Sequence, residues 1–225
     1  MAVVGACLEK IFGASTEALV TGNPRTYRSK IVISNVRFGL FAPDPGGLEQ
    51  AEKAFVTTAT DRAIRGRYPN LKHLCLIRDM NSHDPAELAI GFRDLVADIG
   101  KPETQPTDLG DGRFQLPNLS LCQILMGDSN FGVMDRNAVD DHVVDCLCQR
   151  SRQDLRQLIA AFEEITSNPP TSKQFVTLAM ALDGHMGDAT RYYEEVIKST
   201  SEEWIAGFIG RIGLERIIQV AIAGS

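Results

Sequence analysis

The sequence predicts a mainly α protein, built as a helical bundle with a small β element near residues 29–41. Three observations support this fold class. From residue 138 to the end, apolar residues recur at the spacing of an α-helix. In the first half, one helix is marked by start and stop signals on both sides. The alternation of apolar and polar residues that is typical of a half-buried strand is clearest in residues 29–41.

Residues 29–41 carry the strand signal. Ile31 and Ile33 occupy alternate positions, and from Val36 the apolar residues alternate on the opposite parity. Because a shift of one residue moves every side chain to the other face of a sheet, we expect a bulge or tight turn between Ile33 and Val36. Two amphipathic helical patterns flank this strand, at residues 3–20 and 48–64.

The clearest helix of the first half begins at Pro85. Asp84 can cap it, proline suits its first turn, and Glu87 completes a capping box. Gly100 ends it. Its apolar stripe consists of Leu88, Phe92, Leu95, Val96 and Ile99.

The stretch after this helix suggests a division of the chain. Residues 101–112 are polar and rich in proline and glycine, which indicates a boundary or an exposed loop. Residues 114–126 are apolar and fit either a strand or a helix. We therefore expect an N-terminal α+β part over residues 1–105 and an all-helical part over residues 106–225, with one continuous domain as the alternative.

The C-terminal half reads as successive helices with their own caps. Asp188 precedes one of them, and Thr200 with Glu203 forms a capping box before another. The helices are marked by Val139, Val143 and Leu147, then Leu155 to Ile165, Phe175 to Leu182, Tyr192 to Val196, Trp204 to Ile212, and Leu214 to Ile222.

Charge argues against a generic nucleic-acid binder. The 225 residues carry a formal net charge of −6, whereas nucleic-acid-binding proteins usually present a basic face to the phosphates. Local exceptions exist, because two segments concentrate arginine. These residues are expected to be solvated faces or partner contacts and are the candidate nucleic-acid contacts: Arg62, Arg65 and Arg67 (with Lys72 nearby), and Arg150, Arg152 and Arg156.

Cysteine usage and hydropathy predict a cytoplasmic protein, in a cell or in an infected host cell. No secretory signal pattern is recognised at the N-terminus, and no uncharged apolar run approaches the roughly 20 residues that a bilayer span requires. The cysteine count is odd and the spacing irregular, which favours reduced thiols. The five residues are Cys7, Cys75, Cys122, Cys146 and Cys148.

The sequence assigns no catalytic, cofactor-binding or metal-binding residue. It contains no phosphate-binding glycine loop, and Gly110-Asp111-Gly112 is interpreted as a turn. On one helix His142 and Cys146 share a face, but Cys148 points away from Cys146, so the three residues do not form a metal site. Adjacent carboxylates such as those of residues 140–141 are expected to be solvated edges of helices.

Large aromatic side chains in the last third of the chain are candidate packing or interface anchors, because such residues dominate both cores and interface hot spots. They are Tyr192, Trp204 and Phe208.

Residues 168–218 resemble the N-terminal regulatory region of formins. The residues that carry the resemblance are Asn168-Pro169-Pro170, Phe175-Val176, Leu182, Ile197-Lys198-Ser199, Trp204-Ile205, Phe208-Ile209, Gly213-Leu214 and Ile217. In that family a GTPase-binding segment runs into armadillo-type helices. The resemblance implies helical packing and a protein partner of the Rho-type GTPase class.

Three functional hypotheses follow. The first is a non-enzymatic protein that interacts with a protein partner, or self-assembles as a homo-oligomer, through its helical C-terminal half. The second is a viral structural protein, such as a coat, nucleocapsid or matrix subunit, that binds nucleic acid through the arginine-bearing segments. The third is a cysteine-dependent or metal-dependent enzyme, which the sequence supports least.

Overall fold

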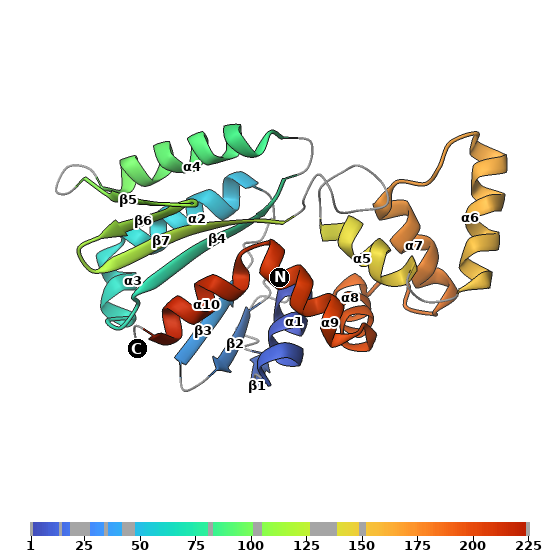
Figure 1. Cartoon of the computed structure of the whole chain (residues 1–225), viewed down its shortest axis with the longest axis horizontal. Helices are drawn as coiled ribbons and strands as arrows, with labels where there is room; N and C mark the ends of the chain where they lie inside the picture. The colour runs from blue at the N-terminus through green and yellow to red at the C-terminus, as the bar shows by residue number, and fades with distance from the viewer. Residues whose placement is uncertain are drawn as a thin grey trace.

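The computed structural model confirms a mainly α protein, but with two small sheets (Figure 1). Helices α1–α10 and strands β1–β7 are assigned within the described residues. Those residues are 2–13, 15–18, 28–33, 36–41, 48–80, 83–100, 105–126, 139–148 and 152–223.

The first sheet contains the predicted β element. Helix α1 (Ala2–Phe12) precedes the antiparallel strands β1 (Ser15–Ala18), β2 (Arg28–Ile33) and β3 (Val36–Phe41). Ile33 lies opposite Val36 in this pairing, and the turn expected between them lies outside the described residues. The single helix expected over residues 3–20 is wrong at its end, because residues 15–18 form β1. The chain turns at Gly13, whose φ of 60° favours glycine, and β1 then pairs with β2.

The second sheet has the strand order β4-β7-β6-β5. It consists of β4 (His73–Asp79), β5 (Thr107–Gly110), β6 (Arg113–Leu116) and β7 (Leu119–Met126). Strand β4 pairs with β7 in parallel, and the other pairs are antiparallel. Helices α2 (Leu48–Thr60) and α4 (Pro85–Gly100) pack their apolar residues against one face of this sheet, and the short α3 (Arg62–Arg67) leads into β4.

Two sequence predictions are corrected by the second sheet. Residues 106–225 are not all helical, because β5, β6 and β7 lie within them. The expected division between residues 105 and 106 also crosses this sheet, since β4 pairs with β7. Strand β7 was ambiguous because it is a nearly continuous apolar run, and a buried strand and a buried helix look alike in such a run. The Gly110-Asp111-Gly112 turn between β5 and β6 is confirmed, with positive φ at all three residues.

Local signals placed most helix ends well. The side chain of Asp84 accepts a hydrogen bond from the Ala86 amide (2.8 Å) at the start of α4, whose stripe is buried at Leu88, Phe92, Val96 and Ile99. The helix expected over residues 48–64 is instead two helices. Asp61 separates them, because its carboxylate caps the first amides of α3.

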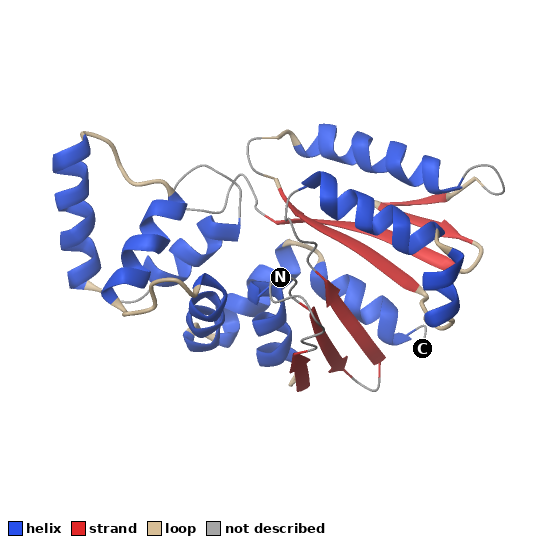
Figure 2. Ribbon diagram, turned by 180° about the vertical axis from the view of Figure 1, so that it is seen from behind, coloured by secondary structure: helices blue, strands red, loops and turns tan. Residues whose placement is uncertain are grey.

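The helices predicted after residue 138 are confirmed in the described residues. They are α5 (Val139–Cys148), α6 (Gln153–Thr166), α7 (Ser172–Leu182), α8 (Ala189–Ser199), α9 (Glu202–Arg211) and α10 (Leu214–Ala223). We call these six helices, together with α1, the helical lobe. Helix α1 packs against α8 and α9, so the first residues of the chain complete the core made by the last ones. Helix α6 stands at the outer end of the lobe and packs against α7 (Figures 1 and 2).

The apolar residues that carry the formin resemblance lie mostly in this core. Phe175, Val176, Ile197, Ile205, Phe208, Ile209 and Leu214 are all buried. The matching pattern therefore coincides with the packing of helices α7–α10. None of the described helices is both long and apolar enough to cross a bilayer.

We predict that Phe208→Ala destabilises the protein by about 3–5 kcal/mol, because a fully buried ring leaves a cavity. The Phe208 ring lies between Trp204 (centroids 5.4 Å apart) and His142 (4.7 Å). Ile165, which is 82% exposed, is the control, and Ile165→Ala should change stability by no more than about 0.5 kcal/mol. Chemical denaturation measures both. Equal losses for the two variants would contradict this description of the core.

Candidate functional site

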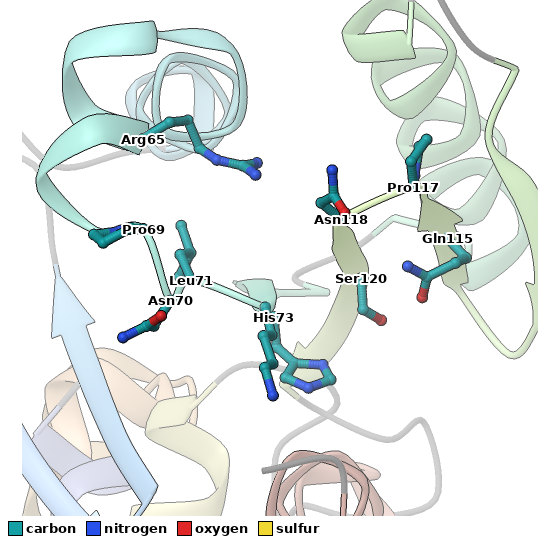
Figure 3. Close-up of a pocket in the computed structure, with 10 residues that line it drawn as sticks. Arg65, Pro69, Asn70, Leu71, His73, Gln115, Pro117, Asn118 and Ser120 are labelled. Atoms are coloured by element: carbon teal, nitrogen blue, oxygen red, sulfur yellow. The ribbon is translucent and has the colours of Figure 1, made fainter.

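A polar cleft opens at the beginning of strands β4 and β7. Its volume is about 580 Å³, within the ~300–1,000 Å³ range of small-molecule sites. The end of α3 and the segment leading into β4 form one wall, and the turn between β6 and β7 forms the other (Figure 3). The polar residues that line it are Arg65, Asn70, Lys72, His73, Gln115, Asn118 and Ser120.

The floor of the cleft is set by strand register. His73 of β4 lies opposite Ser120 of β7, and Ser120 lies opposite Gln115 of β6. Residues paired in this way direct their side chains to the same face of a sheet. The Ser120 amide also donates to the Lys72 carbonyl (2.8 Å), which fixes the start of β4 against β7. Three neighbouring strands therefore present one polar row.

The same sheet face becomes apolar toward the other end of the strands. Four residues further along, Ile77 lies opposite Ile124, and both pack against the core of the helical lobe. The side chains on the opposite face of these strands, such as Leu76 and Leu121, pack with α2 and α4. The row of His73, Ser120 and Gln115 is half-buried and borders the cleft.

The cleft has a cationic lining. Arg65 and Lys72 supply two cations, and no aspartate or glutamate is among the described residues that line the cleft. Burial lowers the pKa of His73, and the nearby Lys72 lowers it further. The His73 imidazole is therefore neutral at neutral pH, with one ring nitrogen that donates and one that accepts.

Arg65 is placed to meet a ligand. It is half-buried and extends from α3 across the cleft toward Asn118 (Figure 3). It forms no ion pair with any residue in the described part of the chain. Asp61 lies one helical turn earlier, but its carboxylate instead accepts from the amides of Ala63 (2.7 Å) and Ile64 (3.2 Å).

The other predicted arginine contacts have different surroundings. Arg62 and Arg67 are exposed on α3 beside the cleft. Arg152 is held by Asp154 and Asp183, each at 2.9 Å, and Arg156 is exposed on α6. Arg150 lies outside the described residues. Because α3 and α6 lie at opposite ends of the molecule, the two segments do not line one groove (Figures 1 and 2).

The three aromatic anchors lie in the helical lobe. Tyr192 and Phe208 are buried, and the Tyr192 hydroxyl donates to Asp183 (2.8 Å). Trp204 is half-buried, stacks on Phe208 and donates from its indole nitrogen to Asp145 (2.9 Å). All three contribute packing contacts within this chain.

A second group of polar side chains lies where β4 meets the helical lobe. Asp79, the last residue of β4, accepts a hydrogen bond from the Val139 amide at the start of α5 (3.1 Å). Asp140 accepts from the Tyr193 hydroxyl, and the buried Asp141 accepts from the Ser172 hydroxyl. The expectation that residues 140–141 form a solvated helix edge is therefore wrong. They face inward because α7 and α8 pack on this side of α5.

This group of carboxylates has no metal-binding arrangement within the described residues. Among the described residues, no three histidine, cysteine, aspartate or glutamate side chains lie close enough to share a metal ion. Along α5, His142 and Cys146 are buried in the lobe core while Cys148 is exposed. The carboxylates of Asp79, Asp140 and Asp141 therefore connect the sheet to α5, α7 and α8.

The two cations of the cleft, Arg65 and Lys72, stood out in the sequence, but its uncharged polar residues did not. His73, Ser120 and Gln115 belong to three different strands, and β4 itself carried no recognised pattern. Their proximity follows from the parallel pairing of β4 with β7, which no local pattern encodes. The local sequence signal for this part of the cleft is a pair of polar residues, Lys72 and His73, directly before the apolar run of β4.

Comparisons with known proteins show the fold. No family model and no curated protein matches the chain. A solved structure, hypothetical protein PH0156 from Pyrococcus horikoshii OT3, is similar, with a TM-score of 0.66 and 13% identity. The match covers 98% of this chain and 94% of that chain. Both chains thus share one fold over nearly their whole length.

We predict that Asp79→Asn makes the protein more stable at neutral pH. Burial raises the pKa of Asp79, the Val139 amide opposes this, and Asp140 and Asp141 raise the pKa further. A carboxyl whose pKa is raised on folding costs nothing below its unfolded pKa, about 4, and destabilises the fold as pH rises through the folded pKa. The asparagine retains an oxygen that can accept from Val139.

Thermal melting of both proteins from about pH 4 to neutral pH measures this effect. The stability gain of Asp79→Asn should appear on the neutral side and shrink toward the acidic side. Asp94→Asn, at an exposed position of α4, is the control and should leave the pH profile unchanged. A gain that is constant across the pH range would contradict the assignment to the Asp79 charge.

Proposed function

We propose that the protein is a non-enzymatic binding protein that holds a phosphate-bearing ligand in the cleft at the start of β4 and β7. One observation carries this proposal. The chain has a net charge of −6, yet the described lining of its cleft contains Arg65 and Lys72 and no carboxylate. Such a lining attracts anions. The rest of the surface carries the excess negative charge and therefore favours cations.

The side chains of the cleft suit phosphate chemically. The planar guanidinium of Arg65 can donate two parallel hydrogen bonds to phosphate oxygens, and Lys72 adds a point charge. Ser120 on the floor of the cleft and Asn118 on the opposite wall supply neutral donors. His73 can donate as a neutral imidazole and gains charge when an anion raises its pKa.

We predict that Arg65→Ala weakens the binding of inorganic pyrophosphate by at least about tenfold, because a charge-assisted hydrogen bond contributes about 1.5–3 kcal/mol. Isothermal titration calorimetry at low ionic strength measures this, and added salt should weaken wild-type binding. Arg156→Ala on α6 is the charge-matched control and should bind like the wild type. Undetectable binding to the wild-type protein, or equal losses in both variants, would refute the proposal.

A second candidate function, interaction through the helical lobe, is supported by α6. We propose that the lobe is a bundle that presents this helix to a second copy of the chain or to a protein partner. The apolar face of α6 is only partly covered by α7. Leu155 is buried, but Ile165 at the far end of the same stripe is 82% exposed. The formin resemblance suggests a Rho-type GTPase as the partner to test first.

We predict that self-association, measured by size-exclusion chromatography with light scattering, decreases in Ile165→Glu. The charge would lie on the uncovered end of the α6 stripe, where burial in an interface is costly. Ile90→Glu on α4 is a matched control, because Ile90 is also exposed (56%) and lies away from α6. If the wild-type protein is strictly monomeric at high concentration, the proposal that the lobe binds a second copy of the chain is refuted.

A further inference from the structure

We propose that the phosphate-bearing ligand of the cleft is a single-stranded nucleic acid, with one nucleotide in the cleft and a base stacked on Tyr68. This inference rests on the proposed function and names its ligand class. It combines three features: an exposed aromatic residue next in the chain to the cleft lining, additional cations on α3, and neutral amides on both walls of the cleft.

Tyr68 is an exposed aromatic residue that is next in the chain to the residues lining the cleft. It directly follows α3 and directly precedes Pro69, which lines the cleft. Its side chain is 62% exposed, although tyrosine usually buries most of its ring. The Tyr68 amide donates to the Ile64 carbonyl (3.1 Å), so the backbone that carries the ring is fixed by the end of the helix. An exposed ring on a fixed backbone is a stacking platform for a base.

Cations continue beyond the cleft along α3. Arg62 lies three residues before Arg65, on the same side of the helix, and Arg67 follows at the helix end. Both are exposed, and neither forms an ion pair with a residue of the described ranges. A single phosphate needs only the cations inside the cleft. A row of cations that extends past it matches the repeated charges of a nucleic-acid backbone.

The size and chemistry of the cleft favour a single strand over a duplex. Its volume of about 580 Å³ accommodates a nucleotide, whereas the bases of a duplex are stacked inside and cannot reach Tyr68. Asn70 and Asn118 stand on opposite walls, and each amide offers both donors and acceptors to the edge of an unpaired base (Figure 3).

Fluorescence anisotropy with short labelled oligonucleotides of mixed sequence tests the inference. Single-stranded RNA, single-stranded DNA and a blunt duplex are compared on the wild-type protein, and inorganic pyrophosphate is the competitor. We expect at least one single strand to bind more tightly than the duplex. Arg65→Ala should weaken the binding of both the oligonucleotide and pyrophosphate.

Tyr68 variants separate this inference from the proposed function. Tyr68→Ala should weaken oligonucleotide binding by about fivefold to a hundredfold, as expected when one base loses its stacking partner. It should leave pyrophosphate binding unchanged, and Tyr68→Phe, which keeps the ring, should bind oligonucleotides nearly as the wild type does. Thermal melting of each variant verifies that it is folded.

The possible failures are distinct. If pyrophosphate binds through Arg65 but oligonucleotides bind no more tightly, or are insensitive to Tyr68→Ala, the nucleic-acid inference is overturned and the phosphate site stands. Duplex binding as tight as single-strand binding also overturns it. If neither pyrophosphate nor any oligonucleotide binds, the inference and the proposed function fail together.

Discussion

The parallel pairing of β4 with β7 is the constraint that both hydrophobic cores and the candidate site share. The core of the helical lobe, the core between the second sheet and helices α2 and α4, and the candidate site all include residues of these two strands. Because alternate residues of a strand face opposite sides, this one pairing distributes side chains to three environments. Leu76 and Leu121 face α2 and α4, and Ile77 and Ile124 face the helical lobe. At the beginning of the strands, His73 and Ser120 face the cleft. A change of register by one residue would exchange these environments.

Polar contacts at the other end of β4 hold the sheet against its neighbours. The buried Arg78 donates to Glu52 on α2 (2.7 Å) and to Gln123 on β7 (2.6 Å), so it connects a covering helix with two strands. Asp79 accepts from the first amide of α5, and α5 is linked in turn to α7 through Asp141 and Ser172. Burying polar groups of this kind costs free energy unless they form hydrogen bonds or ion pairs. They fix the end of β4 relative to the helical lobe, and the strand carries the cleft at its beginning.

Sequence patterns predicted the parts of this structure that local physics determines. The stripe from Leu88 to Ile99 and the cap at Asp84 identified α4, and the apolar periodicity after residue 138 identified the helical lobe. Strands β4 and β7 were missed or left ambiguous because strands buried on both faces lose their alternation.

Of the residues in the candidate site, the sequence singled out only the two cations. Arg65 and Lys72 stood out as part of a basic cluster, and the arginines near residue 150 stood out equally. What distinguishes the first group is tertiary structure: the cleft gathers Arg65 with uncharged polar groups from three strands, whereas Arg152 is neutralised by Asp154 and Asp183. The burial of the Asp141 side chain could likewise not be predicted from the sequence, because it depends on how α7 packs against α5.

The pKa of His73, followed by NMR through its ring protons, tests the central claim most directly. Burial and Lys72 hold this pKa below its ordinary value in the free protein. An anion bound between Arg65 and Lys72 stabilises the charged imidazolium, so pyrophosphate should raise the pKa of His73. An unchanged His73 titration at a saturating concentration of pyrophosphate would contradict the account.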